Sequence, residues 1–376
     1  MSYDLYVELS GNSQDDVKSL VTGNHRELEV QDIAERIRLL TGVAAQNPST
    51  RDYAVAGDQK QGGGYKSLVH SKSGSKGTPY AKELIASEWK RLEHLGLLRP
   101  SPNLINTMPL GSWFLQFTFT LAKPWMSKDD APFYVAESVN PVRKDKVFKV
   151  PTMSAASWKG LLRWTAMHVR LALKKDEPSD EDFAAERFRQ TLLFGDEKGE
   201  EPGQTKDFAA YLDGSKPSAR ELYVRKVKEY FLGDANAKDM PHHSGRLSFY
   251  PTFFDLIDVE VINPHSRGTK AGTHPIYLEC VPAGAKGTFS LLYVPFDLIG
   301  KPENEVKAQA KEDLLRVAEA VSAMMLTYGF SAKRTSGYGT ARDEIENGVV
   351  RTRARPQGWP LTRLGKLASE VKDVRV

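Results

Sequence analysis

Apolar side chains recur every three or four residues in several parts of the chain, a spacing that places them on one face of a helix. Residues 31–43 and residues 80–97 show this spacing, so we expect an amphipathic helix in each. The same spacing extends over residues 304–328. That stretch is long enough for a helix that packs across a sheet.

A second pattern, the alternation of apolar with polar side chains, predicts strands. It is clearest in residues 112–125, and residues 245–261 and 288–295 are broadly similar. Helical patterns alternate with these strands along the chain. We therefore expect an α+β fold in which helices cover a sheet.

Composition divides the chain into three parts. Residues 1–110 are predicted to form a helical extension, with a flexible loop near residues 47–79, where Gly, Ser, Lys and Gln predominate. Such a composition buries too little apolar surface to fix one conformation. We assign residues 111–345 to the main domain and residues 346–376 to a C-terminal tail.

The overall composition is that of an ordinary globular protein, with 40% hydrophobic and 27% charged residues. Cys280 is the single cysteine, which excludes an intramolecular disulfide and a thiolate zinc site. The N-terminus lacks the features of a secretory leader, and no stretch approaches the ~20 apolar residues needed to span a bilayer. We expect a cytoplasmic protein that does not bind membranes.

Net charge is only +4, but the charges are unevenly distributed. Residues 141–175 contain nine Lys or Arg and one Asp, whereas residues 176–201 contain ten acidic and three basic residues. The switch is typical of two differently solvated surfaces, with the acidic run forming an exposed helix and loop. It also fits a basic surface for nucleic-acid phosphates.

A helix is predicted from about Ser157 to Lys175, with Ser154 or Ser157 as its N-cap. Its basic residues share the face opposite the apolar one: Lys159, Arg163, Arg170 and Lys174. These side chains are either ordinary solvated surface or a cationic stripe. The helix N-terminus is a second feature that favours phosphate.

Residues 329–339, with the sequence GFSAKRTSGYG, form a glycine-rich basic loop directly after the long helix. The glycines permit close backbone approach, Lys333 and Arg334 supply positive charge, and Tyr338 offers a ring for stacking on a base. A helix cap followed by an ordinary turn is the alternative. The order of residues excludes a Walker phosphate-binding loop.

Four motifs in order resemble those of the RAMP superfamily, the RNA-binding subunits of CRISPR effector complexes. The segment from Pro151 to Arg163, which contains Trp-Lys-Gly-Leu-Leu-Arg, resembles its "Leu-Lys-Gly" signature. Leu-Phe-Gly at residues 193–195 and Gly-Arg-Leu-Ser-Phe at residues 245–249 follow, and the loop 329–339 resembles its C-terminal glycine-rich loop. The resemblance covers about residues 112–344.

The resemblance implies a ferredoxin-like, RRM-like fold with insertions, and a role as a guide-RNA (crRNA)-binding structural subunit. The motifs around Asn140 to Asp145 and Asn263 to Gly284 look most like the type III branches. The implied partners are crRNA, target RNA and other effector subunits. The implied RNA contacts are Lys159, Gly160, Arg163, Arg246, Gly329, Lys333, Arg334, Gly337, Tyr338 and Gly339.

Members of the family often carry a protruding hairpin called the thumb. Residues 261–275, with Arg267 and Lys270, are our candidate, and residues 197–241 form a competing insertion.

Cleavage is the main functional alternative. In the type III backbone subunit, an aspartate two residues before Pro-Val cuts target RNA with a divalent metal, and here that position is Val139. Because valine has no oxygen ligand, we expect binding without cleavage, and no metal or cofactor. If the chain is a nuclease that cuts target or processes the guide precursor, Asp129 and Asp130 are the candidates, with Mg²⁺. An unrelated globular protein with chance motifs is a third possibility.

Histidine and cysteine are two further residue types that can carry chemistry. The histidines at positions 242, 243, 265 and 274 fit no standard zinc-ligand spacing, so we interpret them as surface or RNA-contacting residues. Cys280 is expected to be a small core residue, because no basic neighbour is placed by sequence to activate it.

Overall fold

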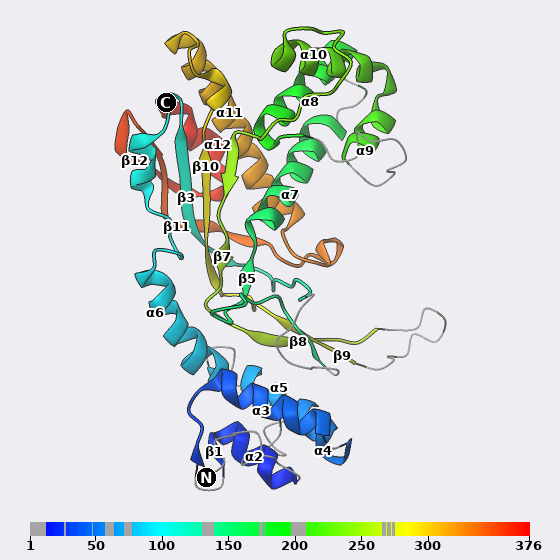
Figure 1. The fold of residues 1–376 in the computed structure, drawn as a ribbon, viewed down its shortest axis with the longest axis vertical. Coiled ribbons are helices and arrows are strands. Elements are labelled where there is room, and N and C mark those ends of the chain that lie inside the picture. Colours follow the sequence, from blue (N-terminus) through cyan, green and yellow to red (C-terminus); the bar gives the residue numbers. More distant parts are fainter. Residues whose placement is uncertain are drawn as a thin grey trace.

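The computed structural model shows a central sheet with helices on one face and helical regions at both ends (Figure 1). It describes residues 13–25, 28–46, 48–56, 64–70, 77–129, 139–172, 176, 178–196, 208–264, 268, 272 and 275–376. Within these ranges, no helix is both long enough and apolar enough to cross a membrane.

The central sheet has five strands in the order β12-β11-β3-β10-β6, and every neighbouring pair is antiparallel. The strands are β3 (Trp113–Leu121), β6 (Leu247–Phe249), β10 (Lys286–Tyr293), β11 (Ala341–Thr352) and β12 (Arg355–Arg363). The middle strand β3 pairs with β10 along its length and with β11 on its other side. The predicted strands at 112–125 and 288–295 correspond to β3 and β10.

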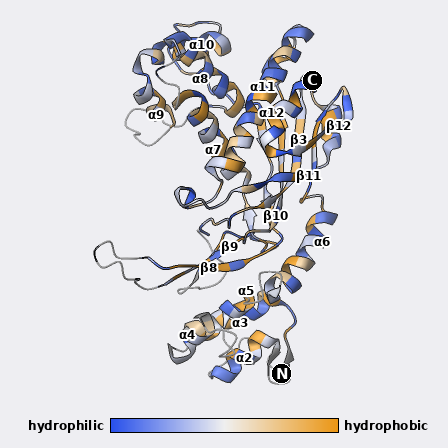
Figure 2. Ribbon diagram, turned by 180° about the vertical axis from the view of Figure 1, so that it is seen from behind, coloured by the Kyte–Doolittle hydropathy of each residue, from blue (hydrophilic) through white to orange (hydrophobic). Residues whose placement is uncertain are grey.

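The two faces of β3 have different surroundings. Phe119 packs edge-on against Trp158, and the indole nitrogen of Trp113 donates to the carbonyl of Ala310 at 3.3 Å, so this face lies against the helices. On the other face, the hydroxyl of Thr118 pairs with that of Thr288 at 3.1 Å. The alternation along β3 therefore directs Trp113 and Phe119 toward the helices and Thr118 away from them. Hydrophobic residues colour much of β3 in the ribbon (Figure 2).

Two helices cover the sheet, α7 (Ala155–Met167) and α11 (Glu303–Ala323). Each continues as a short π-helical turn, η5 (His168–Ala172) and η8 (Met324–Tyr328). These elements confirm the two predicted helices. The structure selects Ser154 as the N-cap of α7, because its hydroxyl oxygen accepts the Ser157 N–H at 3.2 Å.

A helical insertion follows α7 and has its own small core. It contains α8 (Asp180–Phe194), α9 (Phe208–Ser215), η6 (Pro217–Ala219) and α10 (Arg220–Leu232). Phe183, Tyr223 and Val227 are buried together between these helices. The acidic run was expected to be solvated, but half of α8 is buried because its apolar positions pack against α10 and η5.

The N-terminal part is mainly helical. Its elements are α2 (Gln14–Thr22), β1 (Asn24–His25), β2 (Leu28–Glu29), α3 (Ile33–Gln46), α4 (Pro48–Ala56), α5 (Tyr65–Val69), η3 (Tyr80–Ile85), α6 (Ala86–His94) and η4 (Pro102–Thr107). The prediction of a flexible loop near residues 47–79 is wrong for α4 and α5. Tyr65, Leu68 and Val69 are buried, so this stretch has the apolar contacts that its composition obscured. Residues 57–63 and 71–76 lie outside the described ranges.

The prediction of a C-terminal tail at residues 346–376 is also wrong. β11 and β12 form an antiparallel hairpin at the edge of the central sheet. The chain then continues through η10 (Leu364–Lys366), α12 (Leu367–Glu370) and η11 (Val371–Asp373). Leu364, Leu367 and Val371 are buried against the core, which fixes this end of the chain.

A second, smaller sheet projects sideways from the body (Figure 1). β8 (Asp258–Ile262) pairs antiparallel with β9 (Ile276–Cys280), and β4 (Val139–Asn140) adds to β9 in parallel. A short antiparallel pair, β5 (Thr152–Met153) and β7 (Thr252–Phe253), lies near its base. The thumb candidate 261–275 connects β8 to β9, but Arg267 and Lys270 lie outside the described residues.

Candidate nucleic-acid interface

The first turns of α7 and the glycine-rich loop meet at one surface. Between them lies an open cavity of about 630 Å³, which we call the groove. It is lined by Trp125, Met126, Ser127, Met153, Ser157, Gly160, Leu161, Trp164, Phe208, Phe330, Ser331, Ala332, Lys333 and Arg334. Two segments that the sequence singled out independently, about 170 residues apart, are therefore neighbours in the structure.

Glycine gives the loop its shape. Gly329 has φ +72° and Gly339 has φ +69°, a region that side-chain-bearing residues rarely adopt. A Cβ on Gly339 would lie 2.3 Å from the Cβ of Ser331, and one on Gly329 would lie 2.7 Å from the carbonyl oxygen of Tyr338. Both glycines are thus required for the loop to close on itself, which is a structural role.

Backbone hydrogen bonds hold the loop in place. The Phe330 N–H donates to the Gly339 carbonyl at 2.8 Å and closes the loop. The N–H groups of Ala332 and Gly339 donate, each at 2.8 Å, to the carbonyls of Met126 and Pro124 in the segment after β3. The loop is therefore anchored at both ends, with Lys333 and Arg334 between the anchors.

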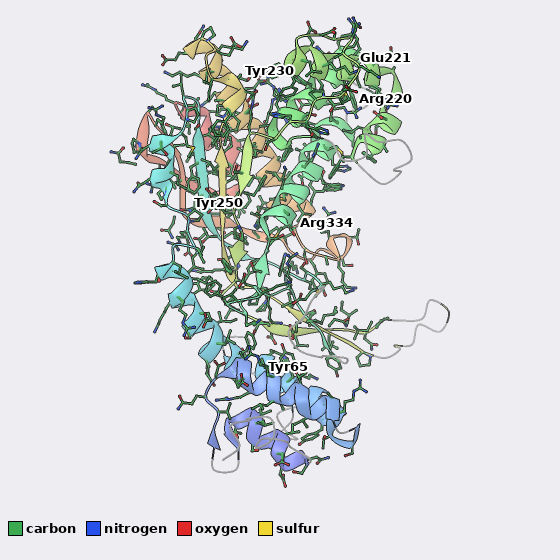
Figure 3. All side chains as sticks on the ribbon, in the orientation of Figure 1. Tyr65, Arg220, Glu221, Tyr230, Tyr250 and Arg334 are labelled. Atoms are coloured by element: carbon green, nitrogen blue, oxygen red, sulfur yellow. The ribbon has the colours of Figure 1, made fainter. Side chains whose placement is uncertain are left out.

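Among the residues that the structure describes, the two basic residues of the loop have no acidic partner. Lys333 is exposed, and its own φ is +59°. Arg334 lies on the glycine-rich loop (Figure 3). Its guanidinium is 4.4 Å from the ring centre of Trp164, and its buried Nη1 has no hydrogen-bond partner among the described residues. Burial lowers the pKa of Arg334. The guanidinium thus retains hydrogen-bonding capacity for an anion.

An aromatic cluster lies beside the groove, and the sequence analysis missed it. Trp164 stacks on His168 with ring centres 4.9 Å apart, and Tyr328 packs edge-on against both rings. Trp164 of α7 and His168 at the start of η5 are four residues apart, and Gly160 is one further turn back. That spacing was the available signal, because it places the three on one helix face. Such rings are surfaces on which bases stack.

Lys159 lies on α7 at the edge of the helix N-terminus and is half-buried. Burial and the positive charge of Arg163 lower the pKa of Lys159, and the carboxylate of Asp196 opposes that shift. Gly160 lines the groove, and a Cβ there would meet nothing within 4 Å. Gly160 is therefore placed for contact with a strand in the groove, whereas Lys159 is not among the lining residues and its RNA contact stays a prediction.

Arg163 does not belong to an open cationic stripe, contrary to prediction. Its guanidinium is buried and donates to the carbonyls of Asp196 at 2.7 Å and Gly195 at 3.1 Å. It thereby fixes the end of α8 against α7. Arg170 pairs with Glu319, and Lys174 lies outside the described residues. Of the predicted stripe, Arg163 and Arg170 are bonded to acceptors within the protein, so Lys159 is the one described member that is not.

Arg246 is likewise a structural residue, and the predicted phosphate contact is wrong. Its side chain is 1% exposed and pairs with Asp297 at 2.5 Å and Asp313 at 2.8 Å. Burial opposes ionisation of Asp297, but the hydrogen bonds and charge of Arg246 outweigh it and lower the pKa of Asp297. Tyr230 of α10 also donates to Asp297 at 2.7 Å, so the network ties the helical insertion to the sheet.

Tyr338 connects the glycine-rich loop to the projecting sheet. Its hydroxyl donates to a carboxylate oxygen of Glu260 at 3.3 Å, and burial and that carboxylate raise its pKa. Gly337, with φ +81°, has open space where a Cβ would be. The roles of Tyr338 and Gly337 in RNA contact stay predictions.

A second cavity, of about 510 Å³, lies on the other side of the start of α7. Asp129, Arg143, Lys146 and Ser154 are among its lining residues. Asp130 falls outside the described residues. Val139 stands in β4, in register with Tyr277. Within the described ranges, no group of three or more His, Cys, Asp or Glu side chains is arranged to hold a metal ion.

The remaining candidates have ordinary structural surroundings. His242 contacts Asp196 at 3.1 Å, and the ring of His243 packs on Phe231 with burial lowering its pKa. The other two histidines, at 265 and 274, lie outside the described residues. Cys280 is buried, and that burial raises the pKa of its thiol, so it behaves as a core residue.

A different group of contacts ties the N-terminal part to the projecting sheet. Tyr65 of α5 and Lys144 both bond to the carboxylate of Glu279 on β9. The side chains of Lys144 and Glu279 are essentially fully buried. His70 contacts Asp258 of β8 at 2.7 Å. Sequence reasoning missed these residues, because no local pattern marks a pair so distant in the chain.

Comparison with known proteins places the chain in a family. The sequence profile of the RAMP superfamily matches residues 132–342, more than half of the chain. No curated protein matches significantly. A chain of the type III-B Cmr-beta complex bound to cognate target RNA is 10% identical, with a TM-score of 0.40, covering 91% of this chain and 100% of that one.

A chain of a CRISPR RNA-guided surveillance complex in a pre-nicking state is 12% identical. The likeness covers 62% of this chain and 77% of that one, with a TM-score of 0.32. The extent of the profile match, together with the motifs that flank the groove, leads to one assignment. The chain belongs to the RAMP superfamily.

Proposed function

We propose that the chain binds guide RNA as a structural subunit of a type III CRISPR ribonucleoprotein, with the RNA strand lying in the groove. One observation carries the proposal: Lys333 and Arg334 line the groove beside the start of α7, and neither has an acidic partner in the described part of the chain. Membership of the RAMP superfamily supports it. The type III branch rests on the sequence resemblance around residues 140–145 and 263–284.

The order of elements supports a ferredoxin-like core, which we infer as part of this proposal. The chain passes through β3, α7, β6, β10, α11 and β11, and these four strands lie in the order β11-β3-β10-β6. A strand-helix-strand-strand-helix-strand path with such interleaving is the split βαβ arrangement. In it, the groove lies at the end of the sheet where α7 begins and α11 ends.

The groove binds RNA mainly through its backbone in this proposal. Lys333 and Arg334 contact phosphates, which positions the strand without selecting a sequence. Trp164 offers a ring face for sequence-tolerant stacking. The anchored loop lowers the entropic cost of binding, because its backbone is already ordered before RNA arrives.

We propose further that the subunit does not cut RNA and needs no Mg²⁺. Valine at position 139 supplies no oxygen to a metal. One observation favours the alternative of a metal-dependent endoribonuclease: Asp129 lines the second cavity together with Arg143 and Lys146, where a phosphate backbone would be attracted. RNA binding and RNA cleavage are both tested on the same purified assembly, as described next.

The test is to express the chain with the genes beside its own, purify the assembly and sequence the RNA that it retains. Short repeat-derived RNA is expected from the parent assembly. Lys333→Glu with Arg334→Glu is expected to lose that RNA, whereas the control Lys366→Glu with Lys372→Glu, at exposed C-terminal positions, should retain it. Retention of normal RNA by the groove variant would contradict the proposal.

The cleavage arm adds labelled complementary RNA and Mg²⁺ to the purified assembly. The proposal expects the same cut pattern from the parent and from Asp129→Ala. Loss of a cut in Asp129→Ala would instead assign a nuclease site to the second cavity.

A further inference from the structure

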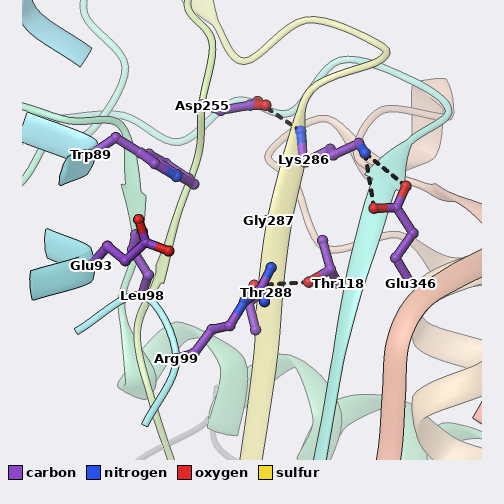
Figure 4. A pocket seen from close by; sticks show the side chains of 10 residues that line it. All are labelled: Trp89, Glu93, Leu98, Arg99, Thr118, Asp255, Lys286, Gly287, Thr288 and Glu346. Carbon is purple, nitrogen blue, oxygen red and sulfur yellow. Dashed lines mark hydrogen bonds and ion pairs between the residues drawn. The ribbon is translucent and has the colours of Figure 1, made fainter. Parts of the chain in front are cut away.

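The face of the sheet opposite the helices carries a separate cavity of about 320 Å³ (Figure 4). Its floor is β3 and β10, through Thr118, Gly287 and Thr288. One wall is α6 and the segment after it. A volume of this size lies at the small end of the range for small-molecule sites, about 300–1,000 Å³.

Local structure fixes the α6 wall. Trp89 and Glu93 are four residues apart, so they share the face of α6 that looks toward the sheet (Figure 4). α6 ends at His94, and two residues later the Gly96 N–H donates to the Glu93 carbonyl while the Leu97 N–H donates to that of Leu92. This Schellman arrangement turns the chain back, which brings Arg99 to the cavity.

Most charges in the cavity are already compensated. Lys286 donates to both carboxylate oxygens of Glu346, at 2.7 and 2.9 Å, and Asp255 accepts the backbone N–H of Lys286 at 2.8 Å. Glu93 and Arg99 have no ion-pair partner among the described residues, and both are exposed at the mouth. The cavity therefore presents one unsatisfied carboxylate and one unsatisfied guanidinium.

We propose that this cavity binds a guanine nucleotide, with the base against the indole of Trp89. An ionised carboxylate only accepts hydrogen bonds, and guanine has two adjacent donors, its N1–H and its 2-amino group, that match the two oxygens of Glu93. Adenine and cytosine place a ring acceptor beside their amino group, and uracil has one donor between two carbonyls. Arg99 contacts the phosphate, and the hydroxyls of Thr118 and Thr288 face the base.

The site is independent of the groove. Thr118 points to the face opposite Phe119, which packs against α7, so the sheet itself separates the two cavities. The nucleotide is either free or an unpaired guanosine of an RNA strand. These sources share the same recognition chemistry and are distinguished by experiment.

The test is isothermal titration of the purified chain with GMP, AMP and UMP, and with the RNAs UUGUU and UUUUU. GMP is expected to bind with a Kd of about a millimolar or lower and at least about tenfold more tightly than AMP or UMP. Trp89→Ala and Glu93→Gln should each weaken GMP binding at least about tenfold. Lys90→Ala, at an exposed α6 residue outside the cavity, and Lys333→Glu with Arg334→Glu should leave it unchanged.

The RNA titrations use the Lys333→Glu with Arg334→Glu variant, so that the groove does not contribute. In that variant, UUGUU binding more tightly than both GMP and UUUUU would identify an RNA strand as the source, and equal affinities for UUGUU and GMP would identify a free nucleotide; both support the proposal. Equal affinities for GMP and UMP, GMP binding that is insensitive to Trp89→Ala and Glu93→Gln, or no nucleotide binding at all would overturn it. So would a cross-link from a flanking subunit's peptide to Trp89 in the assembled complex. Whether Lys333→Glu with Arg334→Glu retains guide RNA tests the proposed function and says nothing about the nucleotide site.

Discussion

The basic side chains of the helical insertion and those of the glycine-rich loop have opposite surroundings. Around the insertion, Arg246 is buried between Asp297 and Asp313, and Arg187 is buried against Asp213 at 2.7 Å with its guanidinium 4.1 Å from the Tyr223 ring centre. In the loop, Lys333 is exposed and Arg334 rests on an aromatic ring. The first group stabilises the fold, and the second is available to an anion.

This difference shows that the role of a cation depends on what lies opposite it. A buried charge requires paired carboxylates or carbonyls to offset its desolvation, and once paired it cannot bind a phosphate. An exposed cation on an anchored loop keeps its donors for a ligand. Substitutions in the two groups should therefore separate stability from RNA affinity.

The largest effect is expected for Arg246→Ala. Removal of this guanidinium leaves two carboxylates close together and without their main partner, so the free energy of unfolding should fall by about 3–5 kcal/mol. Urea denaturation measures the change, with Lys366→Ala as a control that should stay near the parent. A loss below about 1 kcal/mol would show that the network contributes little.

Tyr65→Phe extends the comparison to the buried cation Lys144. The substitution removes the hydroxyl that donates to Glu279, a hydrogen bond to a charged group worth about 1.5–3 kcal/mol. We expect faster amide hydrogen exchange in β8 and β9, with RNA affinity affected less than in the loop variants. Unchanged exchange in both strands would mean that α5 does not hold the projecting sheet.

Lys333→Ala with Arg334→Ala should change affinity and leave stability within about 0.5 kcal/mol of the parent. Loss of two phosphate contacts to a single strand should make the slope of log K against log salt shallower by about 1.4. We expect roughly tenfold weaker RNA binding, equivalent to about 1.4 kcal/mol. Parallel salt titrations of parent and variant measure the two slopes. Identical slopes would show that the loop does not contact RNA phosphates.

The smallest effect concerns pH. Because the pKa of Asp297 is lowered in the folded state, its ionised form stabilises the fold above its ordinary pKa of about 3.9. That contribution is lost as pH falls below about 4 and through the folded-state pKa. Asp297→Asn should therefore be less stable at pH 7 and lose less on acidification, as followed by urea midpoints. If the stability of Asp297→Asn falls with pH as steeply as that of the parent, Asp297 does not make this contribution.

The sequence predicted the elements whose pattern is local. The strand at Trp113–Leu121 and the helices that begin at Ala155 and Glu303 follow from the spacing of apolar residues, because that spacing reflects the face buried in the core. The glycine-rich loop was also recognisable, since glycines and basic residues occur together within a short segment.

Features that depend on distant partners could not be predicted. Arg246 lies 51 and 67 residues from the aspartates that bury it, so its sequence neighbours suggest an exposed cation. In β12, Pro356 and Pro360 resemble turn residues, yet an edge strand tolerates proline because one side has no ladder to complete. Near α5, polar residues outnumber the buried Tyr65 and Leu68, which obscured the helix.

The most direct test of the account is ultraviolet cross-linking of the purified assembly followed by mass spectrometry of the peptides attached to RNA. We expect cross-links in peptides that contain Trp164 or Phe330, at the two sides of the groove. We expect none in the segment around Arg246. Cross-links that avoid both α7 and residues 329–339 and map elsewhere on the chain would contradict the assignment of the groove as the path of the guide RNA.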